Sequence, residues 1–173
     1  MLLRLETERL ILRPFEITDD YDIYTMWASD DEVTKYLTWN THKSIDDTRY
    51  ILNIWLEQYQ KKERINCAIV IKETNRLIGG IDVVGYLDGT PVIGYVISRK
   101  YWNNGYTTEA CKCLLNYLFN QGYKKVRIDA VVENIASNRV IQKCGGKLIN
   151  VIDDYIESKN MYCKINQYEI YNS

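Results

Sequence analysis

The sequence predicts an α/β (α+β) fold, a single domain over residues 1–173 with a mixed, mostly antiparallel sheet and helices on both faces. Three observations predict it. The length of 173 residues suits one core that buries about two-thirds of the unfolded surface. Between residues 66 and 98 the apolar spacing is typical of strands separated by turns. A helical segment at 107–121 then joins two strand-like segments, which predicts a central parallel strand–helix–strand crossover.

The first third of the chain predicts one strand followed by helices. Residues 2–13 are extended and partly alternating, and Pro14 ends them. Thr18, the run Ser29–Asp31 and Ser44 are each expected to begin a helix, because such side chains accept hydrogen bonds from the first turn. Ser44 forms a capping box with Asp47. The expected apolar faces are Ile23, Met26 and Trp27, then Val33, Tyr36 and Leu37, then Tyr50, Ile51, Ile54, Trp55 and Tyr59.

The remaining chain predicts strands interrupted by two helices. Strands at 67–72, 77–84 and 92–98 form a meander. The helix at 107–121 ends at Gly122, and a strand at 125–132 follows it. A short helix from 134 to 144 and closing strands at 147–153 and 162–171 complete the order. The central helix is expected to bury Ala110, Leu114, Tyr117 and Leu118 and to expose Glu109, Lys112, Asn116 and Asn120.

Composition narrows the function classes. The net charge is −1 and basic residues are scattered, which argues against nucleic acid or an anionic membrane as the main partner. No segment resembles a signal peptide or the ~20 apolar residues of a membrane helix, so a cytoplasmic protein is expected. Five cysteines, two of them only two residues apart on a helix, are expected to be reduced and to bind no metal.

The segment 101–110 is the strongest candidate for a binding site. It is a polar turn with one glycine, Gly105, and it lies between a strand and a helix. Such a turn directs several N–H groups at one point beside the positive end of a helix dipole, which suits a phosphate. No Gly-Lys-Ser/Thr follows, and two glycines of a dinucleotide fingerprint are missing, so neither of those phosphate sites is present.

Three motifs resemble the GNAT superfamily of acyl-CoA-dependent N-acetyltransferases, and specifically its RimJ/RimL branch. They are the opening Glu6-Thr-Glu-Arg-Leu-Ile-Leu-Arg-Pro14, the segment Ile93–Ile97 with the turn Tyr101–Ala110, and the run Asn134–Gly145. Together they span nearly the whole chain in the branch's order. One departure matters: Ile141 stands where many relatives have a tyrosine that protonates the leaving thiolate.

The resemblance implies acetyl-CoA as co-substrate and no metal. Backbone N–H groups from Asn103 to Thr108 would hold the pyrophosphate, and the end of the preceding strand would pair with the pantetheine arm. Asn134 is either a pantetheine ligand or the N-cap of its own helix. The cofactor-binding residues expected are Val96, Ile97, Ser98, Trp102, Asn103, Asn104, Gly105, Tyr106, Thr107, Thr108, Asn134, Ser137 and Asn138.

The resemblance also implies direct attack of an amine on the thioester, with a backbone N–H near Ile97 as oxyanion donor. Ser137 is a candidate donor to the thiolate, and Asp82, Tyr86 and Tyr95 are candidate acids or bases. The acceptor is a protein N-terminus or a small-molecule amine, and the loops at 39–44 and 153–161 carry no code for it. A monomer or a homodimer is expected. A CoA-binding regulatory module without catalysis is the alternative function, because Ile141 removes one general acid.

Overall fold

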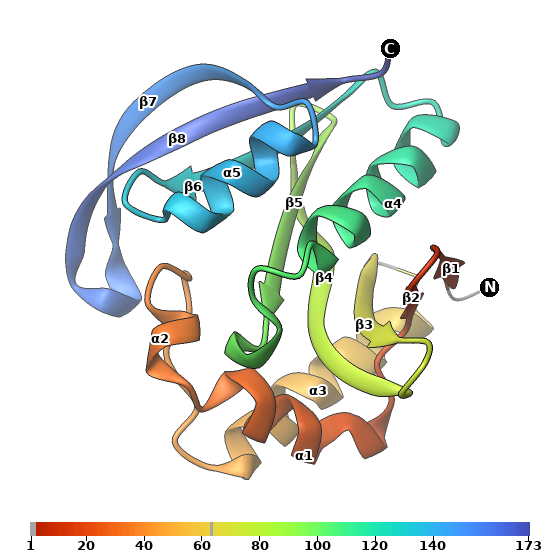
Figure 1. Cartoon of the computed structure of the whole chain (residues 1–173). Helices are drawn as coiled ribbons and strands as arrows, with labels where there is room; N and C mark the ends of the chain where they lie inside the picture. The colour runs from red at the N-terminus through yellow and green to blue at the C-terminus, as the bar shows by residue number, and fades with distance from the viewer. Residues whose placement is uncertain (1–2, 63) are drawn as a thin grey trace.

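A computed structural model describes residues 3–62 and 64–173. Within them one sheet has the strand order β1-β2-β3-β4-β5-β6-β8-β7, and only β5 and β6 are parallel neighbours (Figure 1). The predicted fold class, the meander of β3, β4 and β5, and the crossover are confirmed. The strands are β1 (Leu5–Glu6), β2 (Leu10–Arg13), β3 (Asn66–Ile71), β4 (Arg76–Leu87), β5 (Thr90–Ile97), β6 (Lys125–Val131), β7 (Lys147–Ile156) and β8 (Met161–Tyr171).

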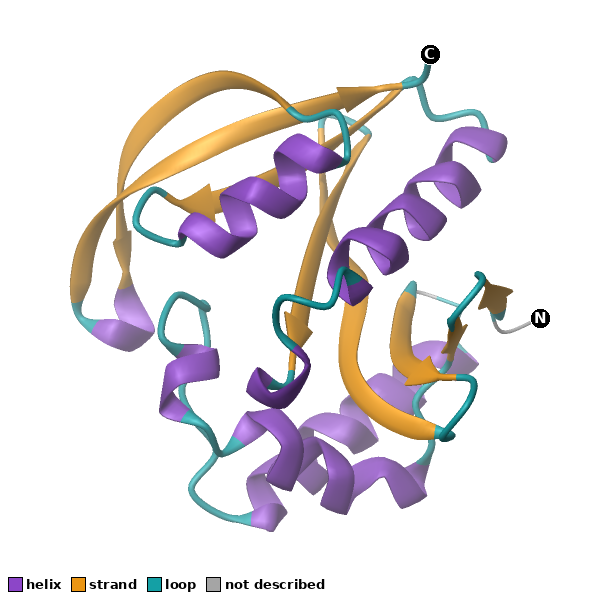
Figure 2. Cartoon of the chain, in the orientation of Figure 1, coloured by secondary structure: helices purple, strands orange, loops and turns teal. Residues whose placement is uncertain are grey.

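Helices cover both faces of this sheet (Figure 2). On one face α4 (Tyr106–Asn120) and α5 (Ile135–Lys143) share a core with inward residues of the central strands. On the other face α1 (Asp20–Ile23), α2 (Asp31–Thr34) and α3 (Ile45–Gln60) surround a second core that includes Trp27 and Leu52. We call these the α4/α5 face and the α1–α3 face.

The N-terminal strand differs from the prediction. Residues 2–13 do not form one strand: β1 and β2 pair antiparallel, with Leu5 opposite Leu12, and residue 2 lies outside the described residues. Thr7 makes the turn possible, because its Oγ1 accepts from Leu10 N at 2.9 Å. Side-chain hydrogen bonds of this kind compete with an extended backbone.

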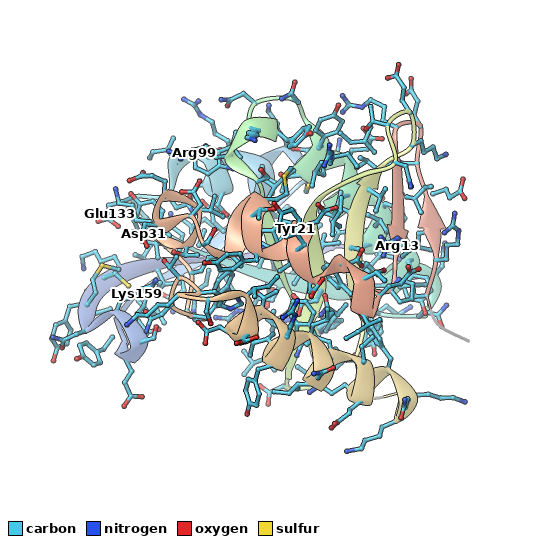
Figure 3. The ribbon with its side chains drawn as sticks, turned by 90° about the horizontal axis from the view of Figure 1, so that it is seen from below. Arg13, Tyr21, Asp31, Arg99, Glu133 and Lys159 are labelled. Carbon is cyan, nitrogen blue, oxygen red and sulfur yellow. The ribbon has the colours of Figure 1, made fainter. Side chains whose placement is uncertain are left out.

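The first helix also begins differently. Thr18 does not cap it; Glu16 and Asp19 form a capping box around a 3₁₀ turn, Ile17–Asp19. Asp19 is buried and receives two hydrogen bonds from Arg13, at 2.8 and 2.9 Å (Figure 3 labels Arg13). The ion pair joins the end of β2 to the start of the helical layer, so a contact six residues back in the chain fixes where the helical layer begins.

The predicted face of α3 is partly wrong. The capping box is confirmed, since Asp47 Oδ2 accepts from Ser44 N at 3.0 Å. Tyr50, however, is 68% exposed, whereas Leu52 is fully buried. An amphipathic segment this rich in aromatic residues allows two neighbouring faces, and packing against Trp27 selected the one with Leu52.

Three smaller findings bear on the expectations. No helix among residues 3–62 and 64–173 is long and apolar enough to cross a membrane. The cysteines at 67, 111, 113, 144 and 163 are free thiols. Over the same residues there is no group of three or more His, Cys, Asp or Glu side chains arranged to hold a metal ion.

Candidate active site

The strands β5 and β6 separate shortly after they meet. Among the described residues they share one pair, Val92 with Arg127. Beyond it β5 continues toward the helices α1–α3 while β6 passes behind α5 (Figure 1). The sheet therefore has an opening beside the second half of β5, where main-chain groups have no strand partner.

The hydrogen-bond pattern identifies which groups of β5 face this opening. Gly79 and Ile97 lie opposite each other, and Ser98 N donates to Ile78 O at 2.8 Å. In an antiparallel ladder this is the signature of a non-hydrogen-bonded pair, so the N–H and C=O of Ile97 point away from β4. Tyr95, two residues earlier, has the same orientation. Both residues turn main-chain groups toward the opening.

The orientation corrects part of the predicted pantetheine edge. Val96 lies in the hydrogen-bonded register with Gly80, so its main-chain groups serve β4, and the N–H of Ser98 is used as described above. The carbonyl of Ile97 accepts from Trp102 Nε1 at 3.0 Å. Of the predicted strand-end residues, only Ile97 therefore keeps an N–H for the opening, and Tyr95 supplies the groups that the sequence did not assign to the cofactor.

The turn before α4 has the geometry of an anion cradle. Gly105 is its N-cap residue with φ 78°, and Asn103 also has a positive φ of 61°. A glycine reaches that region without the steric cost of a Cβ atom. No acceptor in the described residues takes the N–H groups of residues 103–108, which lie at the positive end of the helix dipole.

A clamp from the N-terminus holds this turn. Arg9 donates through Nε to Glu109 at 2.7 Å and through Nη1 to the carbonyl of Asn104 at 3.0 Å. Its guanidinium lies 4.5 Å from the ring centroid of Tyr106. Thr7 Oγ1 donates to the same carboxylate at 2.5 Å. Glu109, predicted to be exposed, is therefore a half-buried anchor for the strand β2.

Tyr95 and Ser137 form a hydroxyl pair at the opening. Their oxygens are 2.8 Å apart, and either can donate. Burial raises the pKa of the Tyr95 phenol, so it stays protonated at neutral pH and can give a proton. Ile141, the departure from the family pattern, is fully buried in the α4/α5 core and contributes no polar group. The structure thus brings two of the predicted catalytic residues together.

The two asparagines of the third motif have different surroundings. Asn134 caps α5, because its Oδ1 accepts from Ser137 N at 3.2 Å, and it also borders the cavity described below. Asn138 is buried, and its amide is used within the protein: it donates to Val131 O at 3.0 Å and accepts from Tyr168 Oη at 2.7 Å. We assign Asn138 to packing between β6, α5 and β8, not to the cofactor.

A cavity of about 660 Å³ passes through the opening and reaches both faces of the sheet. On the α4/α5 face it touches Asn134 and Ser137, and on the α1–α3 face it extends under the helices to β3. Aromatic side chains dominate the second part. Its lining there includes Phe15, Trp27, Tyr36, Trp39, His42, Trp55, Arg64, Asn66 and Asp82.

Asp82 lies on the α1–α3 side of this cavity. Its carboxylate forms an ion pair with Arg64, whose Nη1 also donates to Gln58 at 3.3 Å. Burial raises the pKa of the Asp82 carboxyl, and the guanidinium offsets part of that rise. The side chains of Asp82 and Arg64 are 15% and 26% exposed, and both border the cavity. A carboxylate with a raised pKa suits a general base.

Two glycines keep the cavity floor flat. Gly94 lies opposite Asp82, and a Cβ there would stand 2.7 Å from Val84 Cγ1 and 3.6 Å from Asp82 Oδ1. A Cβ at Gly80 would stand 3.0 Å from the Phe15 ring. Glycine inside a strand often marks a close approach of this kind. That signal was present in the sequence, and it points to the close approach of Phe15 and Asp82 at the cavity floor.

The other candidates lie elsewhere or have structural roles. Tyr86 is exposed near the β4–β5 hairpin and does not border the cavity. His42 borders it, but its Nδ1 is 2.7 Å from Thr48 Oγ1 and its backbone N donates to Ala28 O at 2.8 Å. These bonds hold the loop between α2 and α3 in place.

Comparison with known proteins agrees with this geometry. A family model described as an acetyltransferase (GNAT) domain matches residues 9–147. The chain belongs to the GNAT acetyltransferases. An uncharacterized N-acetyltransferase of Bacillus subtilis, YoaA, is 31% identical over 170 residues, which cover 96% of this chain and 95% of the relative. The protein is thus an acetyl-CoA-dependent N-acetyltransferase by family.

Solved structures give the same fold. A GNAT-family acetyltransferase from Bacillus anthracis superposes with a TM-score of 0.86 at 28% identity, covering 98% of each chain. RimL, a ribosomal L7/L12 α-N-protein acetyltransferase solved with coenzyme A, superposes with a TM-score of 0.85 at 17% identity, again over 98% of each chain. The similarity to RimL is one of fold, and it agrees with the predicted RimJ/RimL resemblance.

Proposed function

We propose that this enzyme transfers the acetyl group of acetyl-CoA to a primary amine, of a protein N-terminus or a small molecule, by direct attack in a ternary complex. The observation that carries the proposal is the opening between β5 and β6. One cavity passes through it, so two substrates approaching from opposite faces of the sheet can meet beside Tyr95. A site built for one ligand needs no such passage.

The α4/α5 face is suited to the co-substrate. The N–H groups of residues 103–108, with Gly105 at φ 78°, form a cradle for a pyrophosphate. The free edge of β5 can accept an extended pantetheine arm as an added strand, with the main-chain groups of Tyr95 as its partners, which leaves the N–H of Ile97 for the reacting carbonyl. When bound, acetyl-CoA supplies a thioester carbonyl that is activated for attack.

The chemistry needs two protons removed from nitrogen and one delivered to sulfur. Asp82 accepts the first proton from the ammonium form, directly or through water, and releases it to solvent. The neutral amine then attacks the thioester carbon, and the nitrogen loses its second proton to the same carboxylate. The N–H of Ile97 stabilises the oxyanion as the C–N bond forms. The C–S bond breaks, and Tyr95 with Ser137 delivers a proton to the leaving sulfur. The hydroxyl pair of Tyr95 and Ser137 thus supplies the general acid that Ile141 cannot.

A thiol-release assay tests the proposal. The enzyme is incubated with acetyl-CoA and a panel of N-terminal peptides, polyamines, aminoglycosides and aryl amines, and products are identified by mass spectrometry. Tyr95→Phe combined with Ser137→Ala is expected to lower kcat at least about tenfold, since general acid catalysis is typically worth 10²–10⁴. Tyr168→Phe, which also removes a buried hydroxyl, is the control.

Two results contradict the proposal. If CoA raises the melting temperature and no amine of the panel is acetylated, the chain binds the co-substrate without this reaction. If the double variant and the Tyr168→Phe control lower kcat equally, Tyr95 and Ser137 have no special part in it.

A further inference from the structure

The acceptor part of the cavity has walls made largely of aromatic side chains. Phe15 and Trp55 lie with ring centroids 4.8 Å apart, and Trp39 lies 5.4 Å from His42. Trp27, almost fully buried, completes the set. These rings come from segments far apart in the sequence and converge on one space. Aromatic walls recognise flat or apolar groups, because each ring contributes a large area of apolar contact.

The inner end of this space holds hydrogen-bond donors without acceptors. Asn66 is 5% exposed, and its Nδ2 has no partner among the described residues. Arg64 Nε is likewise buried and without a partner in the described part of the chain. Both side chains border the cavity. A buried donor that lacks an acceptor is unfavourable, so such groups in native structures call for an explanation, often a ligand or a water.

The charges at this end are already balanced. Arg64 and Asp82 neutralise each other, and Arg64 Cζ lies 6.0 Å from the Trp55 ring centroid. The cation–π position over Trp55 is thus taken by the protein's own guanidinium. A second ammonium group from a polyamine that reached this end would meet this cation, because the lining carboxylate without an ion pair among the described residues, Asp154, comes from β7 at the other edge of the sheet. An aminoglycoside would place many hydroxyl groups against rings that cannot bond them.

We propose that the acceptor is a primary amine on an aromatic body that carries a hydroxyl or carbonyl oxygen, which accepts hydrogen bonds from Asn66 and Arg64. The inference rests on the function proposed above and adds the substrate class. The body lies among Phe15, Trp39 and Trp55, and the amine points past Asp82 to the opening. A free arylalkylamine and a protein chain with an aromatic first residue both present such an amine, aromatic body and oxygen.

Steady-state kinetics with matched amines tests the substrate class. The amines are phenethylamine, tyramine, phenylalaninamide, a peptide with N-terminal phenylalanine, spermidine and kanamycin, each at saturating acetyl-CoA. We expect kcat/KM for tyramine or phenylalaninamide to exceed that for phenethylamine about tenfold or more, because a site with buried donors rejects an analogue that lacks the acceptor. Spermidine and kanamycin are expected to have a lower kcat/KM than every arylalkylamine. Comparison of the peptide with phenylalaninamide shows whether the enzyme prefers a protein N-terminus or a free small amine.

A variant identifies the donor. Asn66→Leu keeps the volume and removes the amide, so the ratio of kcat/KM for tyramine to that for phenethylamine is expected to fall from about tenfold toward one. Asn53→Leu, the same exchange at an exposed position of α3, is the control and should keep the preference. Melting curves of both variants report whether the fold is intact, and CoA-induced shifts report an intact co-substrate site.

The outcomes are distinguishable. If spermidine or kanamycin is the best substrate, or if Asn66→Leu keeps the preference of the unmodified enzyme, the substrate class is wrong and the transferase function stands. If no amine is acetylated although CoA raises the melting temperature, the proposed function itself fails.

Discussion

The two halves of the cavity are built in different ways. The half that we propose for the co-substrate offers main-chain groups of two short segments, the end of β5 and the turn 103–108, which are neighbours in the sequence. The acceptor half uses side chains from β3, β4, α3 and the loops around α1 and α2, which meet only through packing. Main-chain recognition tolerates many sequences, whereas side-chain recognition is specific to each one. The difference explains why a family can share one co-substrate while its acceptors vary.

Removal of the Asp82 carboxylate, on the acceptor side, is expected to have the largest effect on turnover. Asp82→Asn keeps a hydrogen-bond acceptor for Arg64 but removes the base, so kcat should fall about 10²- to 10⁴-fold. The raised pKa of Asp82 also sets the sign of the pH dependence. The base acts as carboxylate, so activity rises as pH increases through that pKa, and the variant should lose this limb. Initial rates between pH 4 and 8 measure both.

Asp20→Asn provides the control for that experiment. Asp20 also pairs with an arginine, Arg49, at 2.7 Å, but on the surface of α1. We expect its rates and pH profile to match those of the unmodified enzyme. An Asp82→Asn enzyme with an unchanged acidic limb would transfer the role of base to another group and would weaken the contrast between the two halves.

On the co-substrate side a single Cβ atom should matter. Gly105→Ala forces a side chain into φ 78° and into the cradle, where the new atom would lie 3.4 Å from Arg9 Nη2. We expect CoA to bind at least about tenfold more weakly, because the pyrophosphate needs close approach to the backbone. The CoA-induced shift in melting temperature, titrated over concentration, measures this loss.

Gly122→Ala is matched to that change. Gly122 has φ 97°, a Cβ added there would meet no atom within 4 Å, and the residue ends the same helix far from the turn. Both substitutions place a side chain in the left-handed region and should each lower stability by roughly 1–2 kcal/mol. Only Gly105→Ala should also weaken CoA binding. Equal CoA shifts in the two variants would show that the turn does not hold the co-substrate.

The same contrast explains what the sequence could predict. The order of elements, the capping box at Ser44 and the anion turn at Gly105 follow from local signals, because each depends on residues within a few positions. The acceptor half does not. Arg64 and Asp82 are 18 positions apart and meet across β3 and β4, a contact that only the strand register decides.

Errors in the prediction have the same physical origin. Thr18 has the chemistry of an N-cap, yet Asp19 with Arg13 from β2 fixed the start of the helix. Leu52, which shares a core with Trp27, replaced Tyr50 on the inner face of α3. In the first case a side-chain contact six positions away, and in the second the packing of distant segments, outweighed the intrinsic preference of the residue. The glycines at 80 and 94 were the one local sign of the acceptor floor.

A smaller effect on kinetics is expected from Arg9, a residue near the N-terminus that supports only the co-substrate half. Arg9→Ala removes the clamp on Asn104 and Glu109, so the cradle loses its support while the acceptor walls keep theirs. We expect KM for acetyl-CoA to rise between about twofold and tenfold, the net worth of a hydrogen bond or so, with KM for the amine unchanged. Arg49→Ala, which breaks a surface pair of equal 2.7 Å length, should change neither KM. A rise in the KM of the amine alone would contradict this assignment.

The smallest expected effect concerns His42, the single histidine of the chain, on the acceptor side. Burial lowers its pKa from 6.5, and Asp47 opposes this only in part. A pKa that is lower in the folded state contributes stability above pH 6.5, and that stability is lost as the pH falls through the folded value. His42→Gln should therefore narrow the difference between urea midpoints measured at pH 7 and pH 5. Its kcat at pH 7 should stay close to that of the unmodified enzyme, because the ring bonds to Thr48 and holds the loop. If His42→Gln lost both its turnover and the acidic limb of the pH profile, His42 would be the base in place of Asp82. The general base of the acceptor half would then lie on a loop and not on the sheet.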